Sequence, residues 1–99
     1  MKKKSAILPY RFKEGELEVL LIKNTRNTKW VIPKGTIEVP LKPAASAAKE
    51  AYEEAGVLGV PMPIMIGTYH KNQQEVPTFL LEVDYVMKRY EEEDMRERC

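Results

Sequence analysis

Apolar and polar positions follow one another along this chain in a pattern that predicts several short strands around a single helix. Short apolar runs bounded by glycine, proline and charged residues are typical of strands. The pattern predicts strands at residues 5–12, 17–23, 30–32, 64–71 and 78–87. The first two should form a hairpin, and the run at 17–23 is apolar enough to be buried on both faces. Prolines make an irregular segment the expectation at residues 58–63.

Between the third and fourth predicted strands the period changes to that of a helix. Pro43 suits the first helical turn, where a missing N–H costs nothing, and Gly56 suits the residue that ends the helix. On a helical wheel Glu50, Glu53 and Glu54 share the side opposite the alanines. Three gathered carboxylates fit either a hard divalent cation such as Mg²⁺ or a solvated acidic surface.

Composition narrows the classes of protein that fit. The chain has 99 residues and a net charge of +1, which predicts one domain over residues 1–99 and gives no general reason to expect nucleic acid as a partner. No apolar run approaches the roughly 20 residues of a membrane helix, so no membrane partner is expected. The single cysteine, Cys99, fits a reducing compartment. We therefore expect a cytoplasmic protein.

The stretch 35–57 resembles the Nudix box. That pattern is Gly, five residues, Glu, seven residues, Arg-Glu, an apolar residue, any residue, Glu-Glu, any residue, Gly and an apolar residue. The positions in register are Gly35, Glu50, Ala51, Glu53, Glu54, Gly56 and Val57. Leu41 stands in place of the first Glu, and Lys49 in place of the Arg. We expect Leu41 to close the loop by packing and Lys49 to keep a positive charge beside Glu50 or Glu53.

The resemblance implies an α+β fold, a Nudix-like α/β/α sandwich with a mixed β-sheet. Members of the family continue with a further strand and helix, so the C-terminal strand and helix are expected to be missing or truncated and the domain to be incomplete there. The charged residues 88–98 are then a solvated loop leading into a strand, or a frayed tail. An apolar face left uncovered would favour self-association.

The resemblance also implies Mg²⁺-dependent hydrolysis of a diphosphate linked to another moiety. The expected substrate is a nucleoside or dinucleoside polyphosphate, or a diphosphoinositol-type compound. Glu50, Glu53 and Glu54 would be the catalytic residues and would hold Mg²⁺ or Mn²⁺ together with the backbone carbonyl of Lys34. The general base stays open among the carboxylates, with Glu54 favoured as the metal ligand and Glu50 as the base.

Four residues are candidates for contact with a phosphorylated small molecule: Lys34, Gly35, Arg11 and Lys49. The alternative comes from a different class of protein. It is a catalytically weak Nudix domain that binds a nucleotide or a protein as a sensor, which the departures at Leu41 and Lys49 motivate. Turnover with Mg²⁺, set against binding without turnover, separates the two hypotheses.

Overall fold

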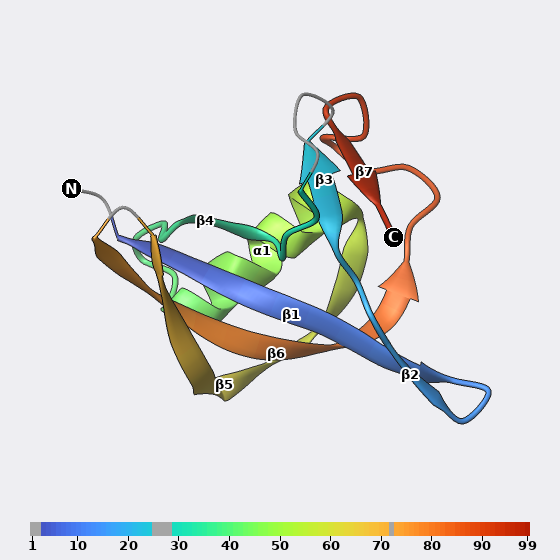
Figure 1. Ribbon diagram of the computed structural model, residues 1–99, viewed down its shortest axis with the longest axis horizontal. Coiled ribbons are helices and arrows are strands. Elements are labelled where there is room, and N and C mark those ends of the chain that lie inside the picture. The colour runs from blue at the N-terminus through green and yellow to red at the C-terminus, as the bar shows by residue number, and fades with distance from the viewer. Residues whose placement is uncertain (1–2, 25–28, 72) are drawn as a thin grey trace.

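The computed structural model describes residues 3–24, 29–71 and 73–99. Figure 1 shows one helix beside long, twisted strands. Along the chain the elements are β1 (Lys4–Lys13), β2 (Glu16–Val19), β3 (Ile22–Asn24), β4 (Lys34–Thr36), α1 (Pro43–Ala55), β5 (Val57–Lys71), β6 (Gln74–Val86) and β7 (Arg96–Arg98).

The strands form a larger mixed sheet and a small second one. The larger sheet has the order β2-β1-β6-β5, and β4 also pairs with β1. The pairing of β1 with β6 is parallel, whereas the pairs β1–β2, β1–β4 and β5–β6 are antiparallel. The second sheet joins β3 to β7. The expected α+β fold with a mixed sheet is thereby confirmed.

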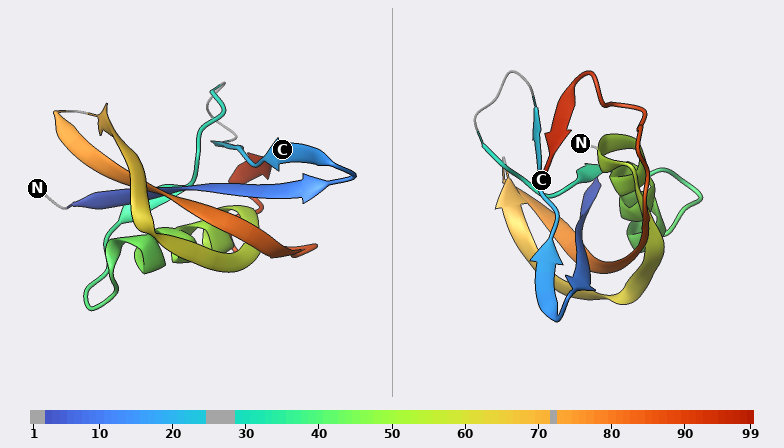
Figure 2. Two further views of the ribbon diagram at one scale, coloured as in Figure 1. Left: turned by 90° about the horizontal axis from the view of Figure 1, so that it is seen from below. Right: turned by 90° about the vertical axis from the view of Figure 1, so that its right-hand side faces the viewer.

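The core lies between α1 and one face of the larger sheet, as the left view of Figure 2 shows. The helix contributes fully buried alanines, which lie against Ile7, Phe79 and Leu81. Because alanine is small, the helix backbone can approach the sheet closely. This places the glutamates of α1 next to β4.

Both predicted ends of the helix are confirmed. Pro43 occupies the first turn, and Gly56 ends the helix with a φ of 67°. The N–H of Gly56 donates to the carbonyl of Tyr52 at 3.0 Å. A Cβ at Gly56 would lie 2.7 Å from the Cβ of Tyr90. Glycine is therefore needed here for both its conformation and its size.

The prediction of one doubly buried strand at 17–23 is wrong. The chain forms β2, which is exposed, and then β3, which belongs to the other sheet. Hydrogen bonds show where the change occurs: Leu20 donates to the carbonyl of Pro9, whereas Leu21 donates to that of Cys99. The apolar run is long because the segment serves two sheets in succession; Ile22 is buried in the core, and Leu20 packs against it.

The prediction of a strand at 30–32 is also wrong. Trp30 is 41% exposed and Val31 is 36% exposed. Val31 exchanges two hydrogen bonds of 2.8 Å with Ile22 in an isolated bridge. The strand in this region is β4, which begins at Lys34 and includes Gly35.

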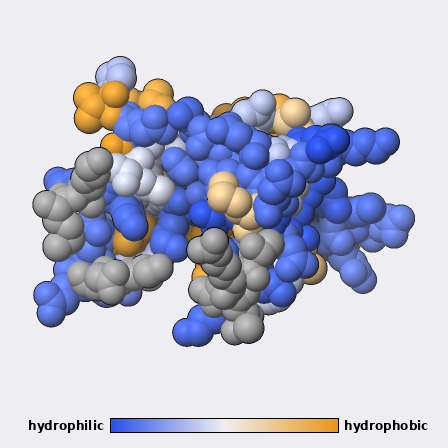
Figure 3. All heavy atoms as spheres, turned by 90° about the horizontal axis from the view of Figure 1, so that it is seen from above, coloured by the Kyte–Doolittle hydropathy of each residue, from blue (hydrophilic) through white to orange (hydrophobic). Residues whose placement is uncertain are grey.

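Residues 58–63 are not irregular, because β5 runs through them. Pro61 and Pro63 are accommodated because β5 pairs on one side only, with β6, and its register shifts between Pro61 and Met65. Residues 96–98 form the short strand β7, where a missing or truncated C-terminal strand was expected. Figure 3 shows a mostly hydrophilic surface on the side where Figure 1 places β3 and β7.

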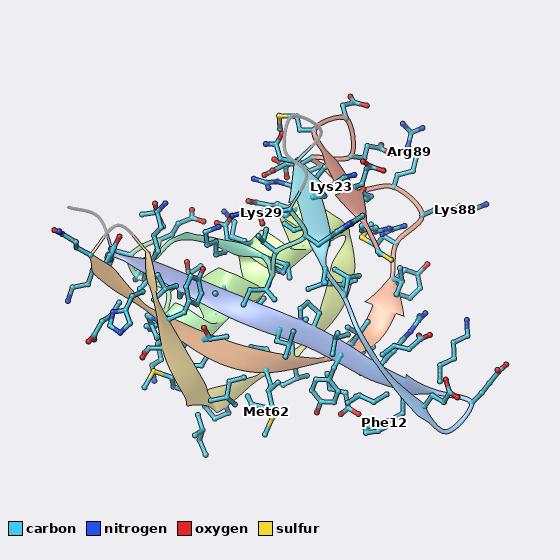
Figure 4. All side chains as sticks on the ribbon, viewed as in Figure 1. Phe12, Lys23, Lys29, Met62, Lys88 and Arg89 are labelled. Carbon is cyan, nitrogen blue, oxygen red and sulfur yellow. The ribbon has the colours of Figure 1, made fainter. Side chains whose placement is uncertain are left out.

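The described residues contain one helix, so they do not supply the second helical layer of the expected sandwich. Several apolar side chains of β5 are exposed, and Val60 and Ile64 are each 71% exposed. In Figure 4, Met62 and Phe12 extend from the lower edge of the molecule. Self-association through these residues stays a prediction. Within the part of the chain that the structure describes, no helix is long and apolar enough to cross a bilayer.

Candidate functional site

The site is centred on Glu54, a buried carboxylate. Glu54 is only 4% exposed, although it is an ionisable residue in the last turn of α1. The backbone N–H of Lys34 donates to Oε1 of Glu54 at 3.4 Å. The carboxylate opens into a cavity of about 180 Å³. The residues that line this cavity are Lys4, Ile22, Val31, Ile32, Lys34, Gly35, Glu54 and Arg96.

Glu50 lies one turn before Glu54 and packs directly on Gly35. A Cβ placed on Gly35 would lie 2.6 Å from Oε2 of Glu50. The φ of Gly35 is not positive, so glycine is needed for space and not for conformation. The absent side chain lets the Glu50 carboxylate rest against the backbone of β4. The opening glycine of the box therefore leaves the space that the Glu50 carboxylate occupies.

Burial and mutual proximity change the acidity of these two groups. Burial raises the pKa of Glu54 to about 8; Arg96 opposes this increase, and a hydrogen bond with Glu50 adds to it. Burial also raises the pKa of Glu50, and its hydrogen bond with Glu54 acts in the opposite direction. The pair therefore holds a proton near neutral pH. A divalent cation could replace that proton, because metal ligands must be deprotonated.

The backbone of Lys34 faces the same pair. The carbonyl of Pro33 accepts a hydrogen bond of 3.0 Å from Ile7 of β1. Backbone groups of successive strand residues point to opposite sides. The N–H and C=O of Lys34 consequently point away from β1, which agrees with the contact from this N–H to Glu54. The candidate carbonyl ligand thus lies on the side of β4 that faces α1.

Glu53 is not gathered with the other two carboxylates. Its Oε2 lies 3.2 Å from Nζ of Lys49, and Lys49 also contacts Glu38 at 2.9 Å. Among the residues that the structure describes, no group of three or more His, Cys, Asp or Glu side chains could hold a metal ion. Two carboxylates and one carbonyl nevertheless fit a hard cation, which fills its remaining positions with water and phosphate.

The loop before the helix is held differently from the expectation for Leu41. Leu41 is 39% exposed, and its N–H donates to the carbonyl of Glu38 at 2.7 Å. The N–H of Glu38 donates to Oγ of Ser46 at 3.0 Å, while the Ser46 hydroxyl donates to the carbonyl of Thr36 at 3.4 Å. Glu38, which pairs with Lys49, and the buried Ser46 therefore support this loop instead of packing by Leu41. Lys49 lies beside Glu53, one of the two expected alternatives.

Sequence reasoning missed the contribution of the C-terminal arm, which we define as residues 88–98. Nη2 of Arg96 lies 3.9 Å from Oε2 of Glu54, and Nε of Arg96 donates to Oε1 of Glu92 at 2.7 Å. The N–H of Glu92 donates to the carbonyl of Glu53 at 3.0 Å. The i,i+4 spacing of Glu92 and Arg96 was a signal of a local turn. It could not show which pair meets the helix, because Arg89 and Glu93 have the same spacing.

Arg11 is not brought to Glu54. It pairs with Glu18 at 2.7 Å and lines a second cavity of about 620 Å³, beyond the C-terminal end of α1. The two cavities share no lining residue. Of the four substrate candidates, Lys34 and Gly35 lie at the Glu54 cavity, and Lys49 lies on the adjoining loop side.

Comparison with known proteins decides the family. The model of the NUDIX domain matches residues 2–98. This chain belongs to the Nudix family. Diphosphoinositol polyphosphate phosphohydrolase 3-alpha of Mus musculus is 35% identical over 95 residues, which cover 92% of this chain and 57% of that protein. Its Homo sapiens counterpart is 40% identical over 73 residues, which cover 73% of this chain and 43% of that protein. The chain thus spans about half the length of these relatives.

Solved structures show the same fold. A Nudix family hydrolase from Clostridium perfringens superposes with a TM-score of 0.77 at 18% identity, covering 99% of this chain and 79% of that one. The Ap4A hydrolase of C. elegans superposes with a TM-score of 0.68 at 20% identity, covering 100% of this chain and 80% of that one. These Nudix structures and the present chain therefore share their topology over the whole length described.

Proposed function

We propose that this Nudix domain hydrolyses a phosphoanhydride bond in a diphosphate linked to another moiety. The observation that carries the proposal is the pairing of Glu54, which is buried and lines a small cavity, with the half-buried Glu50, which packs on Gly35. Burying acidic groups costs free energy unless a partner compensates. Perturbed carboxyls in a cavity are typical of functional sites.

Glu50, Glu54 and the carbonyl of Lys34 would hold Mg²⁺ or Mn²⁺. When bound, such a cation withdraws charge from phosphate oxygens and lowers the pKa of a water molecule. The residues of the chain then have separate tasks. Glu54 accepts a hydrogen bond from the N–H of Lys34, and we assign Glu50, whose pKa is raised by burial, as the group that accepts a proton from the attacking water. Glu53 supports the helix through Lys49 and would join the ligand set only after leaving that ion pair.

We propose a highly phosphorylated substrate, either a diphosphoinositol polyphosphate or a dinucleoside polyphosphate. Three residues with cationic side chains line the cavity, namely Lys4, Lys34 and Arg96. Clustered cations bind several phosphate groups better than one. The names of the relatives in Mus musculus and Homo sapiens support the first class, and that of the C. elegans structure supports the second.

The test is a product assay with Mg²⁺ or Mn²⁺ over diphosphoinositol pentakisphosphate, Ap4A, ATP and ADP-ribose. We expect kcat/KM to be highest for one of the first two compounds. The matched control is Glu54→Gln, which keeps the size of the side chain and removes its charge. Equal, cation-independent rates for the parent and the variant would refute the proposal.

A second candidate is a Nudix domain that binds its ligand with little turnover. The specific observation in its favour is the ion pair that keeps Glu53 at Lys49, away from Glu50 and Glu54. Tight binding of one of the four compounds with Mg²⁺ present, without product after many hours, would select this candidate.

A further inference from the structure

The site contains a fixed positive charge that comes from outside the Nudix box. Arg96 of β7 lies with Nη2 3.9 Å from Oε2 of Glu54, and its side chain is only 25% exposed. It lines the same cavity as Lys34 and Gly35. This guanidinium therefore faces the carboxylate that we assign to the cation.

Glu92, and not Glu54, holds Arg96 in place. Nε of Arg96 donates to Oε1 of Glu92 at 2.7 Å, whereas 3.9 Å to Glu54 is too long for a hydrogen bond. Glu92 is itself anchored, because its N–H donates to the carbonyl of Glu53. The guanidinium thus has a defined position beside Glu54 while the carboxylate oxygens of Glu54 remain accessible to the cavity.

A fixed positive charge acts with opposite sign on the two ligands of such a site. It repels a divalent cation that binds to Glu54, and it attracts the phosphate groups that accompany that cation. Arginine is also suited to phosphate because its planar fork can donate two parallel hydrogen bonds. The expected signature of this residue is weaker cation binding together with stronger anion binding.

We propose that Arg96 is a phosphate-binding residue of this site, positioned by Glu92 on the C-terminal arm, and that it lowers the affinity of the empty site for a cation. The site then favours the cation when it arrives with a phosphorylated substrate over the cation alone. This inference rests on the proposed function, since it assumes that Glu54 takes part in cation binding.

The test compares Arg96→Gln with Arg89→Gln. Arg89 lies on the same arm and makes an i,i+4 ion pair with Glu93 at 2.8 Å, but its side chain is 82% exposed. Figure 4 shows it extending away from the rest of the molecule. Two binding constants are measured by calorimetry without turnover: that of Mn²⁺ alone, and that of imidodiphosphate, a diphosphate that resists hydrolysis, at saturating Mn²⁺.

For Arg96→Gln we expect Mn²⁺ to bind about three- to tenfold more tightly and imidodiphosphate at least about tenfold more weakly, the scale of one charge-assisted hydrogen bond. Arg89→Gln should change neither constant. Arg96→Lys keeps the charge without the fork, so it should leave Mn²⁺ affinity near that of the parent and still weaken imidodiphosphate. This second variant serves the same test if Arg96→Gln does not fold.

The outcomes separate this inference from the proposed function. If the parent binds Mn²⁺ neither alone nor together with imidodiphosphate, both are overturned. If the parent binds Mn²⁺ and Arg96→Gln alters neither constant, or weakens both alike, Arg96 has no role or only a structural one, and this inference alone is overturned.

Discussion

The two ends of α1 are held by different chemistry from different parts of the chain. At the N-terminal end, two serine hydroxyls make the contacts: Ser5 of β1 donates to the carbonyl of Pro43 at 2.9 Å, and Ser46 of the helix links the end of β4 to the loop. At the C-terminal end, carbonyls of the last helical turn accept hydrogen bonds from residues that follow the helix. Gly56 bonds to Tyr52, Glu92 to Glu53, and Arg98 to Ala55 at 2.8 Å.

This difference shows that the two ends of one helix can be supported by different kinds of contact. The last four carbonyls of any helix lack partners within it. Here three of them are bonded, one by Gly56 of the box and two by the C-terminal arm, which lies far away in sequence. The arm also delivers Arg96 to Glu54. Support of the helix end and completion of the site therefore come from the same segment.

The largest expected effect distinguishes the glutamates at this end of the helix. Glu54→Gln should lower kcat/KM by at least about 10²–10³, because it removes a buried charge that faces the cavity. Glu53→Gln should lower it by only about tenfold, roughly 1.4 kcal/mol, because that carboxylate is held by Lys49. Steady-state kinetics at saturating Mg²⁺ measure both. Equal losses would show that Glu53 leaves Lys49 and works as Glu54 does.

The pH dependence of stability should reveal the proton held by the carboxyl pair. The folded protein keeps the Glu54 proton up to about pH 8, whereas the unfolded chain releases it near 4.5. The folded state therefore binds more protons within this window, and the free energy of unfolding should fall as pH rises through it. Urea unfolding in EDTA from pH 5 to 8 measures the slope, which Glu54→Gln should largely abolish. A parent slope that is flat or rising would contradict this assignment.

The two helix ends can be weakened one at a time. Arg98→Met removes the hydrogen bond to Ala55 and the contact of the guanidinium with the Tyr90 ring, 4.6 Å from its centroid. Ser46→Ala removes the loop contacts. Each should lower the free energy of unfolding by about 1–3 kcal/mol. If the arm completes the site, Arg98→Met should also weaken imidodiphosphate binding, whereas Ser46→Ala should alter it less. The reverse order would place the more important support at the loop.

A smaller and more local effect is expected at Gly35. Gly35→Ala places a methyl group where the Glu50 carboxylate lies, so that carboxylate must move. We expect Mn²⁺ affinity to fall by about tenfold while the melting temperature changes little, since the end of a flexible side chain gives way. Gly67→Ala is the control, because its Cβ would meet nothing within 4 Å. Similar affinities for the two variants would mean that Glu50 is not confined by β4.

The smallest effect concerns the two departures from the family pattern. Glu38 already pairs with Lys49, so Leu41→Glu and Lys49→Arg, alone or together, should each change kcat/KM by less than about fivefold. Glu38→Gln removes the ion pair with Lys49. In that background, Leu41→Glu and Lys49→Arg together should raise activity by more than the sum of the two single changes. Additive rates in the Glu38→Gln background would show that these positions do not interact.

Sequence could predict the helix, its two ends and the glutamates, because Pro43, Gly56 and the spacing of the box are local signals. Prediction from the sequence failed where contacts between distant parts of the chain decide the structure. The run at 17–23 is split because Leu20 and Leu21 bond to opposite parts of the chain. The burial of Glu54 and the approach of Arg96 depend on the C-terminal arm. No local pattern distinguishes Arg96 from Arg89, because each has a glutamate four residues away with which it pairs.

The parallel pairing at the centre of the larger sheet has a consequence for folding kinetics. Strands β5 and β6 form a hairpin whose partners are close in sequence, and its contacts can be made early. Strand β1 must instead join β6 by bringing residues 6 and 78 together. The entropy cost of closing so long a loop is incurred before its contacts stabilise the chain. We therefore expect the docking of β1 on the hairpin and helix to limit the rate of folding, and Ile7→Val to slow folding more than it speeds unfolding.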